Sequence, residues 1–184
     1  MRLLFAAVIL AAVGAHSIAQ DKKGATVELA GMKSVTPADW KEEPLPAKSM
    51  RMQQFRLPKA EGDQEDAELA IFFFRVNAGS VQDNLARQEK KFEIPGGTKP
   101  EDAIKVEKIK LGGMDAVYQD ITGTYLKKSA PFDPNAKVTK MTGFRQLYVI
   151  FEAKEGQYYM TLVGPGKTIE KHKKAFEDWV KNFK

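Results

Sequence analysis

The sequence predicts an α+β fold in which a sheet made of hairpins is covered by further layers, and three observations support this. Residues 69–76 are apolar on both faces of an extended chain, so a strand there must be covered on both sides. Four later segments form two hairpins, each closed by a short glycine-containing turn. Residues 168–183 carry apolar side chains at helical spacing, which is typical of a helix that packs on a sheet.

The part of the chain that precedes this doubly apolar segment predicts two strands. Residues 26–35, with the sequence TVELAGMKSV, are expected to form the first strand. Residues 48–58 alternate between apolar and polar positions and predict the second strand, which ends at its proline. The charged stretch 61–68 then predicts a turn.

One helix is expected in the middle of the chain, directly after Gly79. Ser80 is placed to cap its first turn, and Asp83 lies three residues on, where a carboxylate stabilises the start of a helix. The side chains that recur at helical spacing are Val81, Leu85, Gln88 and Phe92. The helix is therefore expected to end shortly after this last position, at the IPGG sequence.

The second half of the chain predicts two hairpins and a closing helix. Residues 103–111 and 114–126 form the first hairpin around a Gly-Gly pair, and residues 144–164 form the second around a Glu-Gly pair. Residues 127–142 lie between them and contain prolines and lysines, so a long connection without strands is expected there. The closing helix follows the second hairpin.

This order of segments resembles the PsbP/Mog-type fold. The resemblance is carried by the early PADW, the helix after a doubly apolar strand, the LGG hairpin and the closing YYMTLVG strand with its amphipathic helix. It implies an α/β/α sandwich, in which helices cover both faces of an antiparallel sheet. The chain also resembles uncharacterised exported bacterial proteins in which GTY, a proline-containing loop, a strand such as FRQLYVIFE and LVGP recur in this order. Known members of the fold are mostly non-catalytic binding or assembly factors.

The start of the chain predicts export. Arg2 precedes an apolar run, residues 3–13, and small residues frame a cleavage position before Gln20, as in a secretory signal peptide. We therefore expect residues 1–19 to be a signal peptide and residues 20–184 to form a single globular domain that is periplasmic or secreted. The apolar run is shorter than the roughly 20 residues that a membrane span needs, so none is expected.

Composition narrows the class of partner. The chain contains no cysteine, which excludes a lipid anchor on a cysteine and any disulfide. Its 29 basic and 24 acidic residues are interspersed along the sequence, whereas nucleic-acid binding needs a clustered basic face. No nucleic-acid partner is expected.

Two short motifs near the C-terminus suggest chemistry but are better explained by structure. GPGKT, residues 164–168, lacks the earlier glycine of a phosphate-binding loop, because Thr161 occupies that position. We expect Thr168 to cap the closing helix instead. His172 is the one histidine beyond the signal peptide and lies in the apolar stripe, which predicts a packed histidine with one hydrogen-bond partner.

The acidic residues leave two hypotheses open. In the stretch 61–68, Glu68 occupies the position at which a calcium loop needs glycine, so a solvated turn is preferred to an irregular calcium site. Asp115, Asp120 and Glu152 lie in or beside predicted strands, and an inward-facing carboxylate with a raised pKa can act as a general acid or base. No metal, cofactor or catalytic residue is assigned.

The long connection is the predicted binding element. It combines several lysines with an apolar phenylalanine, and long loops often carry function. The residues are Lys127, Lys128, Phe132, Lys137 and Lys140. The sequence thus predicts a non-catalytic exported binding or assembly module, whose partner is an acidic ligand or an envelope protein. The alternative is a carboxylate-based hydrolase or related enzyme of the cell envelope.

Overall fold

The structure is a computed structural model and describes residues 23–75, 78–130, 133 and 135–184. The predicted signal peptide, residues 1–19, lies outside the described residues. No helix in the described part is long and apolar enough to cross a membrane.

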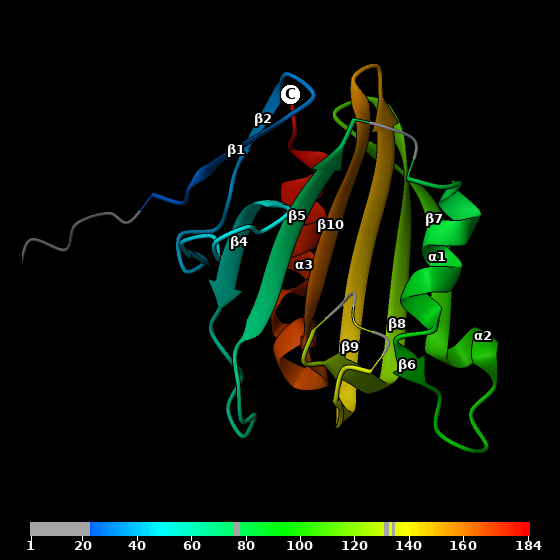
Figure 1. Ribbon diagram of the computed structural model, residues 1–184. Coiled ribbons are helices and arrows are strands. Elements are labelled where there is room, and N and C mark those ends of the chain that lie inside the picture. The colour runs from blue at the N-terminus through cyan, green and yellow to red at the C-terminus, as the bar shows by residue number, and fades with distance from the viewer. Residues whose placement is uncertain (1–22, 76–77, 131–132, 134) are drawn as a thin grey trace, which may run out of the picture.

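An eight-stranded antiparallel sheet forms the body of the fold (Figure 1). Its strands follow the order β3-β4-β5-β10-β9-β8-β6, and β7 also pairs with β8. Their bounds are β3 (Lys41–Glu42), β4 (Arg51–Leu57), β5 (Ala67–Phe74), β6 (Phe92–Glu93), β7 (Ile104–Leu111), β8 (Met114–Lys128), β9 (Val138–Ala153) and β10 (Gly156–Pro165). Both predicted hairpins, β7–β8 and β9–β10, are confirmed.

The first predicted strand, residues 26–35, is in fact a separate hairpin. β1 (Thr26–Leu29) and β2 (Met32–Val35) pair with each other as a two-stranded sheet. The chain reverses at Ala30 and Gly31, whose φ angles are 51° and 77°. The prediction of one strand is wrong because both turn residues adopt the left-handed conformation, which alanine rarely takes.

The closing helix, α3 (Gly166–Lys181), packs against one face of the sheet (Figure 1). Ile169, Phe176 and Trp179 are buried in a core shared with the strands, as the apolar stripe predicts. His172 is also buried, and its Nε2 lies 2.9 Å from the carbonyl oxygen of Pro58. The prediction of a packed histidine with one partner is confirmed.

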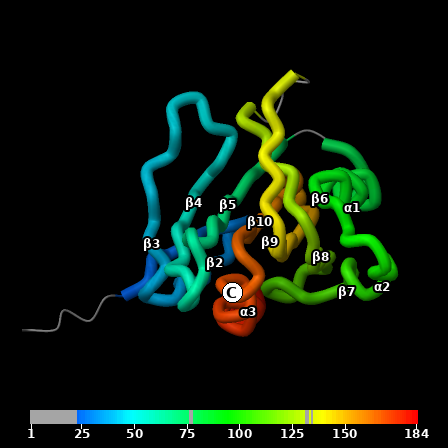
Figure 2. Tube along the Cα trace, turned by 90° about the horizontal axis from the view of Figure 1, so that it is seen from below, coloured from blue at the N-terminus to red at the C-terminus, as the bar shows by residue number. Residues whose placement is uncertain are grey.

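The middle helix, α1 (Val81–Glu89), packs elsewhere on the sheet. Its Val81 and Leu85 contact a second apolar cluster around Tyr148 and Ile150, and Figure 2 shows α1 and α3 on different sides of β8 and β9. The predicted cap is confirmed, because Ser80 and Asp83 form a reciprocal capping box.

The helix ends earlier than its apolar spacing predicts. Phe92 belongs to β6 and not to the helix. The remaining helix, α2 (Pro100–Ala103), is a single turn before β7. The structure therefore confirms an α+β fold built on an antiparallel sheet, whereas a complete helical cover of both faces, as in a sandwich, stays a prediction.

The segment 127–142 was expected to be a connection without strands, and this prediction is wrong. β8 continues to Lys128 and β9 begins at Val138, so paired strands enter the segment from both ends. The ladder extends one step further, because the Ser129 amide donates to the Lys137 carbonyl at 2.9 Å. We call residues 124–130 and 135–142 the hairpin arm. Figure 2 shows it, in yellow, projecting beyond the other strands.

Candidate functional site

The base of the hairpin arm is fixed to the sheet by aromatic packing. The register of β8 and β9 shifts between Gly123 and Tyr125, which is a β-bulge that bends the pair. Beyond the bulge, the Tyr125 ring stacks on Phe144 at a centroid distance of 6.1 Å and packs on Phe92 at 5.2 Å. Together these rings hold the direction in which the arm leaves the sheet.

The four lysines of the predicted binding element are all exposed, but they do not form one cluster. Alternation along paired strands directs Lys127 and Lys137 to one side of the arm, and Lys128 and Lys140 to the other. Lys140 forms an ion pair of 2.8 Å with Glu93 on β6. The fifth predicted residue, Phe132, lies outside the described residues.

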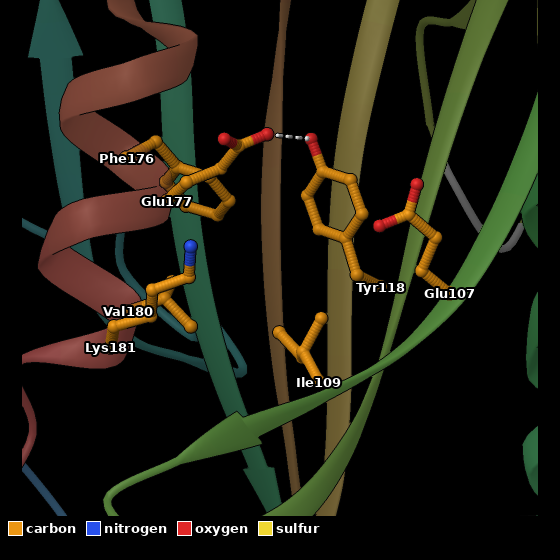
Figure 3. A pocket seen from close by; sticks show the side chains of 7 residues that line it. All are labelled: Glu107, Ile109, Tyr118, Phe176, Glu177, Val180 and Lys181. Atoms are coloured by element: carbon orange, nitrogen blue, oxygen red, sulfur yellow. Dashed lines mark hydrogen bonds between the residues drawn. The ribbon is translucent and has the colours of Figure 1, made fainter.

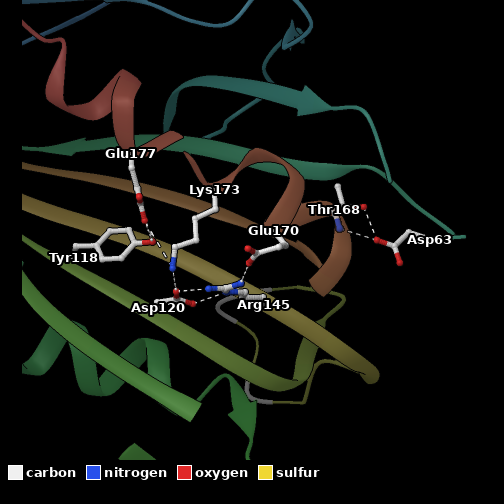
Figure 4. Close-up of polar contacts among 8 residues, drawn as sticks. All are labelled: Asp63, Tyr118, Asp120, Arg145, Thr168, Glu170, Lys173 and Glu177. Carbon is white, nitrogen blue, oxygen red and sulfur yellow. Dashed lines mark hydrogen bonds and ion pairs between the residues drawn. The ribbon is translucent and has the colours of Figure 1, made fainter. Parts of the chain in front are cut away.

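Of the three carboxylates singled out in the sequence, Asp120 is the buried one. It lies on β8, on the face covered by α3, and its side chain is 6% exposed. Arg145 donates to both of its oxygens at 2.7 and 2.6 Å, and Lys173 on α3 donates at 2.6 Å (Figure 4). Burial alone would raise the pKa of the Asp120 carboxyl, but the hydrogen bonds from these two cations outweigh it and lower the pKa.

The ion pairs around Asp120 continue along α3. Arg145 also contacts Glu170, and the Tyr118 hydroxyl donates to Glu177 at 3.2 Å (Figure 4). Burial raises the pKa of the Tyr118 hydroxyl, and the nearby Asp120 carboxylate adds to this rise. The tyrosine is therefore a hydrogen-bond donor at neutral pH. The network ties α3 to the middle of the sheet.

The other two carboxylates do not join Asp120. Asp115 is exposed and pairs with Lys110 at 2.7 Å, and the hydrogen bond from this lysine lowers the pKa of Asp115. Glu152 is exposed on β9. A general acid at neutral pH needs a raised pKa, and in Asp115 and Asp120 the shift has the opposite sign.

A small cavity lies beside this network, between α3 and the β7–β8 pair (Figure 3). Its volume is about 90 Å³, and its apolar wall is formed by Ile109, Phe176 and Val180. Glu107 and Glu177 also line it. Pockets for drug-sized ligands measure roughly 300–1,000 Å³, so this one holds little more than a few solvent molecules.

A wider and more open depression lies where β2 meets the end of α3. Its volume is about 660 Å³, and Lys33, Lys181 and Lys184 line it. The Lys33 amide and the Lys184 carbonyl pair at 2.8 Å, so the end of the chain forms part of its floor.

The GPGKT stretch contains no phosphate-binding loop. β10 runs through Pro165 and α3 begins at Gly166, so strand and helix are directly joined. Thr168 is not the cap that we expected. Its amide and hydroxyl both donate to an Asp63 carboxylate oxygen, at 2.8 and 2.6 Å. A residue of the acidic turn thus closes the start of α3, and the prediction of a merely solvated turn is wrong at this position.

Several of these polar contacts could not be predicted from the sequence. Arg145 and Lys173 reach Asp120 from positions 25 and 53 residues away, and Asp63 reaches Thr168 across 105 residues. No short-range spacing links these partners.

In the part of the chain that the structure describes, no group of three or more histidine, cysteine or acidic residues could hold a metal ion.

Comparisons with known proteins give fold resemblances. No protein-family model matches the sequence, and no curated protein matches it. A cyanobacterial PsbP, CyanoP from Synechocystis, is 14% identical with a TM-score of 0.49, over 94% of this chain and 98% of that one.

Two further structures are similar over most of the chain. PA94, a protein of unknown function from Pseudomonas aeruginosa, is 16% identical with a TM-score of 0.47, over 86% of this chain and 94% of its own. LpqN from Mycobacterium tuberculosis, described as involved in cell envelope biogenesis, is 14% identical with a TM-score of 0.45, over 87% and 83%. A PsbP protein is thus among the structural neighbours, as the sequence resemblance predicted.

Proposed function

We propose that this protein is an exported, non-catalytic binding module that docks an acidic partner on its hairpin arm. One observation carries the proposal. Lys127, Lys128 and Lys137 are exposed on a paired, projecting ladder, and none of them has an ion-pair partner among the described residues. The proposal takes residues 20–184 as the mature domain.

The construction of the arm suits binding. Its backbone is already hydrogen-bonded, so little conformational entropy is lost when a partner docks. Exposed lysines contribute little to folding stability, and Val138, which is 44% exposed, offers an apolar contact beside Lys128. Because lysines occupy both sides of the arm, an acidic partner that wraps or straddles it is favoured over a flat one.

The hydrolase alternative lacks a comparable observation. Asp120 is kept ionised by two cations, and Asp115 is exposed and paired. Glu107 and Glu177 both line the small cavity, but Glu177 already accepts a hydrogen bond from the Tyr118 hydroxyl. Binding therefore remains the better-supported function.

Capture from an exported fraction tests the proposal, with the whole mature chain as bait. The variant Lys127→Gln/Lys128→Gln/Lys137→Gln removes the unpaired charges of the arm. The matched control Lys41→Gln/Lys99→Gln/Lys154→Gln removes three exposed lysines elsewhere. We expect the arm variant alone to lose the captured partner, and the wild-type complex to weaken as salt is raised from about 0.05 to about 0.5 M. Equal capture by the two variants would refute the proposal.

A further inference from the structure

The face of the sheet beneath α1 is unusually polar. Gln119, Gln146 and Tyr148 lie there, each at most 1% exposed. The helix adds Gln88, whose Oε1 accepts from Gln146 at 3.3 Å. Burying amides and hydroxyls costs free energy unless each polar atom is hydrogen-bonded, so a packed cluster of this kind needs an explanation.

Two atoms of this cluster have no hydrogen-bond partner within the described residues: Gln119 Oε1 and the Tyr148 hydroxyl. The orientation of the Gln119 amide is fixed, because its Nε2 donates at 2.9 Å to a carboxylate oxygen of Glu89, which is an acceptor. Its oxygen must therefore point away from Glu89. Gln88 lies beside the Tyr148 hydroxyl without reaching hydrogen-bond geometry. One acceptor and one hydroxyl, on the directly paired residues Gln119 and Tyr148, thus have no hydrogen-bond partner within the described residues.

A cation completes the cluster. The Lys91 ammonium donates to Gln88 Oε1 at 2.7 Å, and no carboxylate in the described part of the chain forms an ion pair with it. Burial, followed by repulsion from Arg87, lowers the pKa of Lys91 to about 8. The other charged or titratable groups at the cluster are Glu89, which is engaged by Gln119, Tyr148 on β9, and Tyr159 on β10, whose ring packs on Tyr148. An anion is the missing counterpart.

We propose that the cluster beneath α1 binds a small hydroxylated carboxylate. The ligand carboxylate accepts from the Lys91 ammonium and the Tyr148 hydroxyl, and the ligand hydroxyl donates to Gln119 Oε1. This arrangement supplies a partner to each unpartnered group.

The ligand reaches the cluster from the C-terminal end of α1, where Lys91 is partly exposed. α1 acts as the cover. Its apolar contacts with the sheet are made by the partly buried Val81 and Leu85, so a small displacement of the helix makes room.

Titration of the mature protein with glycolate tests the site, followed by nuclear magnetic resonance of the glutamine side-chain amides. We expect saturable shifts of the Gln88, Gln119 and Gln146 amides and slower hydrogen exchange in α1. Lys91→Met should weaken glycolate about tenfold or more, and Tyr148→Phe should also weaken it while keeping the ring packing. Lys90→Met, an exposed neighbour, is the matched control and should bind as the wild type does.

Two further compounds test the hydroxyl and the carboxylate of the ligand separately. Acetate lacks the hydroxyl and glycolamide lacks the charge, so both should bind more weakly than glycolate. Affinity for glycolate should also fall as the pH rises above about 8, where free Lys91 loses its proton. Unchanged amide resonances with glycolate, or equal binding by wild type and Lys91→Met, would overturn the proposal and leave the cluster as a site for buried water. Equal binding of acetate would remove the role of Gln119.

Discussion

The two longer helices are attached to the sheet in different ways. α3 buries an apolar stripe that includes Ile169, Phe176 and Trp179, whereas the buried residues of α1 are Asn84 and Gln88. A fully buried large apolar side chain contributes about 1.5–3 kcal/mol, and a neutral hydrogen bond about 0.5–1.5 kcal/mol net. The comparison teaches that α3 belongs to the core of the fold, while α1 is held by two partly buried apolar side chains and by directional hydrogen bonds.

The two helices also differ in how their first turns are closed. α1 is capped locally by Ser80 and Asp83, three residues apart. α3 is closed by Asp63, which belongs to the turn between β4 and β5. The start of α3 therefore depends on the sheet, and the two should unfold together, whereas α1 can unfold by itself.

The largest effect is expected from Phe176→Ala. This side chain is 0% exposed and packs against both Trp40 and Trp179, so truncation should lower the free energy of unfolding by about 3–5 kcal/mol. Denaturant melts measure the change. Lys174→Ala, on the exposed side of the same helix, should shift stability by less than about 0.5 kcal/mol. Equal midpoints for Phe176→Ala and wild type would show that α3 is not part of the core.

The second largest loss of stability is expected from breaking the ion-pair network between α3 and the sheet. Arg145→Leu leaves the buried Asp120 carboxylate with Lys173 alone, and we expect a loss of about 2 kcal/mol. Lys110→Met breaks the exposed pair with Asp115 and should cost less than about 0.5 kcal/mol. If both variants melt alike, burial of the Asp120 pair has no energetic consequence.

The same network predicts a dependence on pH. The folded-state pKa of Asp120 is lowered relative to the unfolded value of about 3.9, so its stabilising contribution is present above about pH 4 and is lost as the pH falls through the folded value. Stability curves between about pH 2 and 6 should be flatter for Asp120→Asn than for wild type. Parallel curves would contradict this assignment.

A smaller effect is expected at the start of α3. Asp63→Ala removes the acceptor of the Thr168 amide and hydroxyl, and loss of a helix cap costs about 1 kcal/mol. Glu61→Ala, an exposed acid of the same turn, is the control. Because α3 unfolds with the sheet, the loss should appear in the global denaturant midpoint. A midpoint that moves equally for both variants would assign the effect to the charge of the turn and not to the cap.

The smallest global effect is expected from the corresponding change in α1. Ser80→Ala should destabilise the helix locally by about 1 kcal/mol and speed hydrogen exchange of its amides about fivefold, with little change in the global midpoint. Gln82→Ala, at an exposed position of the same helix, should leave exchange nearly unchanged. If the global free energy of unfolding also fell by about 1 kcal/mol, α1 would unfold together with the core. The contrast between the two helices would then not hold.

The sequence by itself determined the elements whose causes lie within a few residues. The Ser80 cap, the two glycine-containing hairpin turns and the apolar stripe of α3 are short-range patterns, and each was read correctly. The packed state of His172 followed from the same stripe. These features arise from backbone preference and periodicity, which are properties of local sequence.

Tertiary structure decided the rest. Beyond Leu126, the paired strands of the hairpin arm carry lysines with only the exposed Val138 as an apolar side chain, so their pairing depends on the partner strand and on the aromatic base at Phe144. The left-handed turn at Ala30 depends likewise on the pairing of β1 with β2. Asp63 at the start of α3, the two cations on Asp120 and the polar cluster around Gln119 bring together residues from distant segments. A hydrogen bond depends on distance and angle in space, which no local spacing specifies, and for that reason the candidate sites became visible only in the folded chain.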